Sequence, residues 1–140
     1  MDTLGVRTRF TIAQWPENLK AARAGKLPMW TVGSLASASD GVQSLARYHS
    51  RQIGGQNMAR FKLAEMDVIY ERLQILPDGP ERAALFERAK KLAIAYMPYK
   101  VRMNRVSTDM IQPWVIGYRR PVFWNEWWHY VDIDDSPRKK

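Results

Sequence analysis

Hydrophobic and polar residues alternate near the start of the chain, over residues 4–12. Apolar or β-branched side chains occupy every second position, and these are Leu4, Val6, Thr8, Phe10 and Ile12. A period of two puts these side chains on one face of an extended chain, with Arg7 and Arg9 on the other. The pattern predicts a strand that has one side in water.

A helical period follows at residues 15–24. Pro16 stands at a position where helices accept proline, Glu17 places an acid in the first turn, and Gly25 ends the pattern. Residues 28–33 are short, apolar and rich in β-formers, which predicts a buried strand. Strand, helix and strand in this order predict a βαβ-like start with parallel, right-handed pairing.

The middle of the chain has the spacing of helices. Residues 42–49 predict a short helix, and residues 63–76 and 81–97 carry apolar side chains at helical intervals. Asp78 and Glu81 have the spacing of a capping box at the start of the last of these helices. Two helices joined by a short turn predict a hairpin whose apolar faces need a sheet or a partner to cover them.

Alternation returns at residues 99–106, which predicts a further strand. Residues 113–133 are dense in aromatic side chains and are expected to dock onto a larger core as a C-terminal strand and aromatic segment. Residues 135–140 form a polar tail that is expected to be disordered. Together the elements predict one domain over residues 1–134, with an α/β fold of the mixed α+β kind.

The charge balance raises one class of partner, nucleic acid. The 140 residues hold 22 Lys and Arg against 14 Asp and Glu, a net charge of +8, and a basic domain suits a polyanion. The basic residues are spread over every segment, however, without a run of about five or more. No nucleic-acid partner is therefore expected, and a basic nucleic-acid-binding domain stays as the third alternative.

Candidate catalytic and metal-ligating residues are few. The chain has no cysteine, and its two histidines, His49 and His129, lack the spacing of a metal-binding motif. Each histidine is expected to be a surface or partly packed residue, and the sequence holds no glycine-rich phosphate loop. The sequence thus predicts no enzyme, no catalytic residue, no metal site and no cofactor.

Several short stretches occur together in an order that is typical of one family. They are Trp15-Pro16-Glu17-Asn18-Leu19, Met29-Trp30-Thr31-Val32-Gly33, Asn57-Met58-Ala59-Arg60-Phe61, Leu76-Pro77-Asp78-Gly79-Pro80-Glu81-Arg82 and Gln112-Pro113-Trp114-Val115-Ile116-Gly117-Tyr118. Over about residues 4–134 the chain resembles the C-terminal part of the bacterial extracellular solute-binding proteins of family 5. These are the peptide-, nickel- and haem-type periplasmic receptors of ABC importers.

The resemblance implies a non-catalytic role in transmembrane transport. Members of the family have two lobes that close on a ligand, and they deliver it to an ABC permease. The expected function is therefore to bind a peptide-like or other small solute in an interlobe cleft, as in peptide transport. This chain is expected to be a fragment, the remainder of the second lobe plus the return segment to the first. The alternative is a truncated remnant or a small self-associating interaction domain without a transport role.

The resemblance also implies a location for the full-length parent, the periplasm. This chain shows no signal-peptide pattern at its start and no apolar run of the roughly 20 residues that cross a bilayer. It is therefore expected to be cytoplasmic if Met1 is the true start. The lack of cysteine leaves the compartment open, because exported domains can lack cysteine as well.

Ligand-facing residues are implied around the end of the strand predicted at residues 28–33. These are Trp30, Thr31, Ser34 and Ser37. Peptide-binding relatives carry Gly-Trp-x-x-Asp in this loop, and here Ser34 stands at the tryptophan position and Ser37 at the aspartate position. A hydroxyl cannot supply the charge-assisted bond that a buried ammonium group needs. Either the ligand class differs from a free peptide N-terminus or this copy has drifted.

Overall fold

The computed structural model describes residues 2–34, 36, 38–103, 106–120, 123 and 127–136. Within these residues the elements are η1 (Asp2–Leu4), α1 (Trp15–Arg23), α2 (Val42–Leu45), η2 (Ala46–Tyr48), η3 (Ser50–Gln52), α3 (Ala64–Ile75), α4 (Pro80–Tyr96), β1 (Val115–Ile116), η4 (Trp127–Tyr130) and β2 (Asp132–Ile133). The η elements are 3-10 turns. A set of helices with a small sheet confirms the mixed α+β class.

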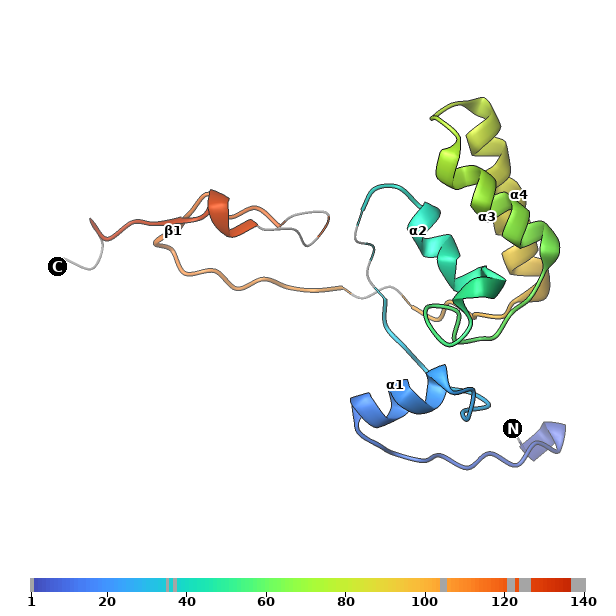
Figure 1. Cartoon of the computed structure of the whole chain (residues 1–140). Coiled ribbons are helices and arrows are strands. Elements are labelled where there is room, and N and C mark those ends of the chain that lie inside the picture. Colours follow the sequence, from blue (N-terminus) through green and yellow to red (C-terminus); the bar gives the residue numbers. More distant parts are fainter. Residues whose placement is uncertain are drawn as a thin grey trace.

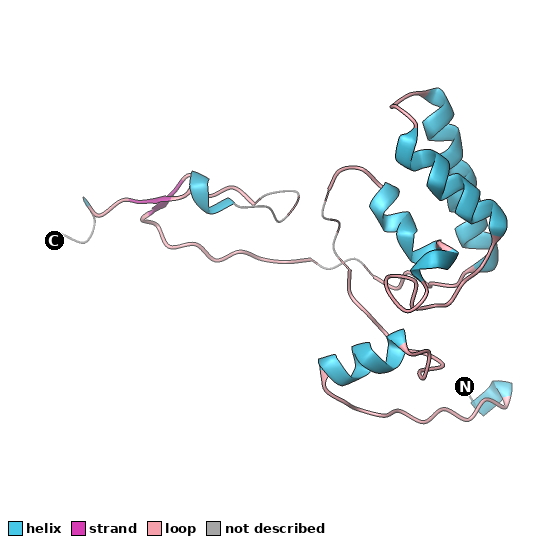
Figure 2. Ribbon diagram, in the orientation of Figure 1, coloured by secondary structure: helices cyan, strands magenta, loops and turns pink. Residues whose placement is uncertain are grey.

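The core of the molecule lies in the predicted helical hairpin, α3 and α4, with α2 and η2 against it (Figures 1 and 2). The buried apolar residues of this core are Val42, Ala46, Met66, Ile69, Tyr70, Leu73, Ala89 and Leu92. They occur at helical intervals, so each helix turns one stripe toward its neighbours. We call residues 42–96, which hold this core, the helical body.

Several helix ends follow the local chemistry that the sequence predicts. Pro16 lies in the first turn of α1, and Gly25 follows the helix with a φ of +71°, a conformation that glycine adopts without steric cost. Met97 ends α4 in a left-handed conformation, with a φ of 42°, directly before Pro98. The helix predicted at residues 42–49 forms as α2 continued by η2.

The capping box predicted at the start of α4 is wrong. Pro80 begins the helix at once, because its fixed φ suits the first helical position. Gly79 is therefore the N-cap, and no side chain caps this end. The carboxylate of Asp78 lies 3.3 Å from Nε of Arg82 and forms an ion pair instead.

The strands predicted over residues 4–12, 28–33 and 99–106 are also wrong for the described residues, and with them the βαβ-like start. We call residues 5–14 the N-terminal arm, and residues 99–103 and 106–112 the C-terminal arm. Both arms are open chain in Figure 2. Alternation selects a face for burial, but a strand forms only where a neighbouring strand accepts its backbone hydrogen bonds. No such neighbour lies beside these segments in the described part of the chain.

A small hairpin lies in the C-terminal aromatic segment, where β1 and β2 pair antiparallel with Val115 opposite Ile133. Gly117 follows β1 with a φ of +77°, and a Cβ there would meet the carbonyl oxygen of Tyr130. Only glycine fits this close approach. The tail prediction for residues 135–140 falls mostly outside the described residues, since these end at residue 136.

The accessible surface of the chain is large for its mass. It is 12094 Å², whereas a compact monomer of 16.3 kDa exposes about 7,500 Å². The arms contribute large exposed apolar side chains to this surface, and these are Val6, Phe10, Ile12, Val101, Met103, Val106, Met110 and Ile111. None of the described helices combines the length and the apolarity that crossing a membrane requires.

Candidate functional site

Trp30 forms an aromatic pair with Trp15, the first residue of α1. Their ring centroids are 5.4 Å apart and their planes are inclined by 22°, which is a stacked arrangement. Trp15 stays more than half exposed, while Trp30 is half-buried. The pair presents a flat apolar surface beside the loop that follows residue 33, and such a surface suits a planar group.

The two described hydroxyls of the predicted site each accept a hydrogen bond from an arginine. Nη2 of Arg47, in η2, donates to Oγ of Ser34 at 2.9 Å. Nη1 of Arg102, in the C-terminal arm, donates to Oγ1 of Thr31 at 3.4 Å. Ser37 lies outside the described residues. The contacts of Trp30, Thr31 and Ser34 thus lead to three different elements, two of which supply a cation.

A small polar hollow lies beside Ser34. Its volume is 160 Å³, and its polar lining comes from Ser34, Asp40, Gln43, Ser44, Arg47 and Gln56. The sequence analysis identified Ser34 but missed Arg47, the only arginine or lysine that lines this hollow among the described residues. The signal in the sequence was weak, because an arginine within a short predicted helix has many equivalent counterparts in a basic chain.

A wider hollow of 370 Å³ lies between the start of α4 and the loop before α2, and Arg82 lines it. Arg82 is buried and fully engaged. Its guanidinium donates to the carbonyl oxygens of Leu73 and Leu76 and to Oδ2 of Asp40, the last at 2.7 Å. This arginine joins the end of α3 to α4 and to the loop before α2. Its positive charge is therefore already paired with groups of the fold.

Asp40 is the carboxylate that joins both hollows. The backbone amide of Val42 donates to its Oδ1 at 3.0 Å, and this bond, with the contact to Arg82, lowers the pKa of Asp40 below its ordinary value of 3.8. Because Oδ2 accepts from Arg82, the negative charge of Asp40 is paired within the fold.

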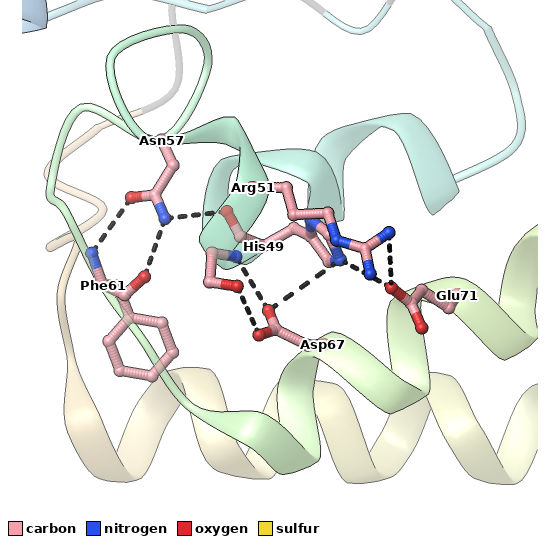
Figure 3. A network of polar contacts seen from close by, with 7 residues as sticks. His49, Arg51, Asn57, Phe61, Asp67 and Glu71 are labelled. Carbon is pink, nitrogen blue, oxygen red and sulfur yellow. Dashed lines mark hydrogen bonds and ion pairs between the residues drawn. The ribbon is translucent and has the colours of Figure 1, made fainter.

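A third polar cluster surrounds His49, at the junction of η2, η3 and α3 (Figure 3). Nε2 of His49 lies 3.3 Å from Oε1 of Glu71 and 4.0 Å from Oδ1 of Asp67. The backbone amide and hydroxyl of Ser50 both donate to Asp67, at 2.8 and 2.6 Å. Arg51 adds an ion pair to Glu71 at 3.5 Å.

Asn57 completes this cluster from the loop before α3. Its side-chain amide donates to the carbonyl oxygens of His49 and Phe61 and accepts from the amide of Phe61, at 2.8 to 3.1 Å (Figure 3). Asn57 is completely buried, and its bonds satisfy both backbone groups of Phe61 and add to the bond that the carbonyl oxygen of His49 accepts from the amide of Gln52. The sequence analysis placed a loop here but did not identify the residue that holds it.

The geometry of the His49 cluster is that of a structural support. His49 is 4% exposed, and its ring packs against Tyr70 with centroids 4.9 Å apart. Its Nδ1 is buried and has no hydrogen-bond partner among the residues that the structure describes. The hydroxyl of Ser50 donates a hydrogen bond to the carboxylate of Asp67 and not to the imidazole of His49. These three side chains therefore do not form the arrangement that activates a serine nucleophile. Among the described residues no group of three or more acidic or histidine side chains is arranged to hold a metal ion.

The chain is similar to one curated binding protein. It is 27% identical over 132 residues to Heme-binding protein A of Haemophilus influenzae, a match that covers 94% of this chain and 24% of that protein. The chain therefore spans about a quarter of the length of this relative. No protein-family model matches the chain, and no solved structure matches it either. The likeness supports a distant relationship to a binding protein and not to an enzyme.

Proposed function

We propose that this chain forms one wall of the ligand site in a non-catalytic solute-binding protein, and that the solute is haem or a peptide-like molecule. The observation that carries the proposal is the match of almost the whole chain to Heme-binding protein A. The role of such a protein would be to capture the solute in the periplasm and deliver it to an ABC permease.

The geometry around Trp30 supports a planar solute that bears negative groups. The Trp15 and Trp30 pair supplies a flat apolar surface, and Arg47 and Arg102 lie against the neighbouring hydroxyls. A porphyrin with carboxylate side chains combines both features, an extended ring and anionic groups. A free peptide N-terminus fits less well, because Ser37, at the position of the aspartate in peptide-binding relatives, supplies no negative charge for an ammonium group.

The large accessible surface of the chain supports the proposal that it forms one wall of the ligand site and does not enclose the ligand alone. A ligand pocket usually encloses about 300–1,000 Å³ and buries most of its ligand. The hollow beside Ser34 is 160 Å³. The exposed apolar side chains of both arms offer a face that further protein would cover.

A chimera tests the proposal. The whole chain replaces the segment that it matches in the Haemophilus influenzae relative, and circular dichroism establishes that the chimera is folded. Absorbance titration with hemin then measures binding, in parallel with calorimetric titration of an oligopeptide. The matched control is the relative with this segment deleted.

The chimera is expected to bind hemin with an affinity within about tenfold of the intact relative, and the deletion control is expected to lose binding. The free chain is expected to bind more weakly than the chimera, since one wall buries only part of the solute. A folded chimera that binds neither hemin nor oligopeptide would contradict the proposal.

A second candidate function, self-association, is favoured by the apolar side chains of the arms. Phe10 is 89% and Ile12 is 97% exposed, and unpaired apolar segments of this kind can pair with a second copy. Size-exclusion chromatography with light scattering tests this candidate on the full chain. A strictly monomeric mass at every loading concentration would exclude it.

A further inference from the structure

The hollow beside Ser34 has the features of a subsite for one anionic group. We propose that this hollow binds a carboxylate of the ligand and that Arg47 is the residue that recognises it. The inference rests on the proposed function and adds to it the chemical class of solute, an acid. Three observations support it. Arg47 has no carboxylate partner among the described residues, its position is fixed by its neighbours, and the hollow has the size of a small anionic group.

The charge of Arg47 has no carboxylate partner among the described residues. Arg47 as a whole is half-buried, and among the described residues its side chain donates from Nη2 to Oγ of Ser34 at 2.9 Å, in an exposed bond. Ser34 is a neutral acceptor, so this bond leaves the positive charge in place. A guanidinium has five donors in a planar fork, which suits a carboxylate in two-point contact.

Asp40 is the carboxylate in the lining of the hollow, and both of its oxygens already accept hydrogen bonds from other residues. Its Oδ1 accepts from the amide of Val42 and its Oδ2 accepts from Arg82 at 2.7 Å. The ion pair with Arg82 compensates the negative charge of Asp40, whereas no carboxylate of the described residues pairs with Arg47. The local balance at the hollow therefore favours an incoming anion.

Arg47 is held in place by its neighbours in the helical body and by Tyr99 at the start of the C-terminal arm. Ala46 belongs to the buried core, and Tyr48 packs against it. The hydroxyl of Tyr99 donates to the carbonyl oxygen of Arg47 at 3.2 Å, while its ring meets Tyr48 edge-on at 5.4 Å. A recognition residue on a supported element needs little reordering when a ligand binds.

The size of the hollow limits what enters it. At 160 Å³ it is smaller than a complete small-molecule pocket of about 300–1,000 Å³. It can take a carboxylate with a short carbon arm, while a ring system would stay outside. Gln56 lines the same hollow and can donate an amide N–H to the second oxygen of the anion.

Nuclear magnetic resonance titration of the full chain with sodium propionate tests this inference. Propionamide is the neutral probe of the same shape, and sodium chloride at equal ionic strength controls for screening. Saturable shifts are expected at the amides of Ser34, Arg47 and Gln56 with propionate and not with propionamide. Arg47→Met is expected to weaken propionate binding at least about tenfold, and Arg47→Lys, which keeps the charge, is expected to lose less.

Arg51→Met is the matched control, because it removes the same charge from an exposed residue in the adjacent turn η3. It is expected to leave propionate binding unchanged. Unchanged α3 and α4 resonances establish that each variant is folded. Equal shifts with propionamide, no saturable shift, or undiminished binding by Arg47→Met would each overturn the inference.

The probe is a carboxylate alone, so its result is separate from the hemin titration of the chimera. Hemin binding without a propionate response rejects the carboxylate subsite only. A propionate response in a chain whose folded chimera binds neither hemin nor oligopeptide rejects the proposed function only.

Discussion

The helical body and the two arms differ in how far they bury their apolar side chains and pair their backbone hydrogen-bonding groups. Both contain regularly spaced apolar residues, yet Leu73 in α3 is completely buried while Val101 in the C-terminal arm is 84% exposed. A helix closes its hydrogen bonds within itself and needs only one neighbour for its apolar stripe. A strand needs neighbours both for its backbone hydrogen bonds and for its apolar face. The comparison shows that the body buries its own apolar stripes, whereas the arms leave theirs exposed.

The same difference holds for polar groups. In the body, Asn57 satisfies three backbone groups, and Arg82 joins α3, α4 and the loop before α2. The contacts from the arms to the rest of the molecule are fewer. The bond from Arg102 to Thr31 is exposed, whereas Tyr99, at the start of the C-terminal arm, makes a partly buried bond to the carbonyl oxygen of Arg47. Opening the arms therefore costs little free energy, whereas opening the body exposes its core.

The largest effect is expected when the core of the body is reduced. Leu73→Ala removes a completely buried side chain between α3 and its neighbours, and should lower the free energy of unfolding by about 2–5 kcal/mol. Urea denaturation followed by circular dichroism measures this change. The matched variant Val101→Ala, in the C-terminal arm, should stay within about 0.5 kcal/mol of the parent. Equal losses in the two variants would break the comparison.

A smaller loss is expected when the loop support of the body is removed. Asn57→Ala leaves the carbonyl oxygen and the amide of Phe61 without their partner and removes one of the two bonds to the carbonyl oxygen of His49. This should lower the free energy of unfolding by about 2–3 kcal/mol. Asn18→Ala is the control, because Asn18 makes one bond, to the carbonyl oxygen of Ala13. Its loss should be no more than about 1 kcal/mol. A larger loss for Asn18→Ala in the same denaturation assay would contradict this account.

The smallest effect concerns acid. The pKa of Asp40 is lowered in the folded protein, first by the amide of Val42 and also by Arg82. A lowered pKa stabilises the fold at pH values above the ordinary value of 3.8, and this contribution is lost as the pH falls below about 4 and through the lowered pKa. Asp40→Asn should therefore flatten part of the decrease in unfolding free energy below pH 4, measured by denaturation at several pH values. Asp135→Asn, which removes an exposed charge near the C-terminal end, should leave the decrease unchanged. An identical slope for the parent and Asp40→Asn would refute the assignment.

The sequence predicts the helices well because their signals are local. Proline before Glu17, glycine at position 25 and Met97 before a proline mark ends that depend only on neighbouring residues. The strand predictions are wrong for the opposite reason. The alternation at residues 4–12 favours burial of one face, but it does not indicate which segment would cover that face.

The candidate site is foreseen in part. The resemblance implies that Trp30, Thr31 and Ser34 face a ligand, and this role stays a prediction; what the structure adds is one contact for each of them. The partners Arg47 and Arg102 come from 13 and 71 positions further along the chain. No spacing rule connects such pairs, so only the folded chain identifies them.

Hydrogen exchange of the free chain and of the chimera tests the central claim most directly, that the arms belong to a binding wall completed by further protein. In the free chain, the amides of α3 and α4 should be protected, and those of residues 5–14 and 106–112 should exchange near the unprotected rate. In the folded chimera the same arm amides should gain protection, and hemin should increase it. Arms as protected as α3 in the free chain, or unprotected in both proteins, would contradict the account.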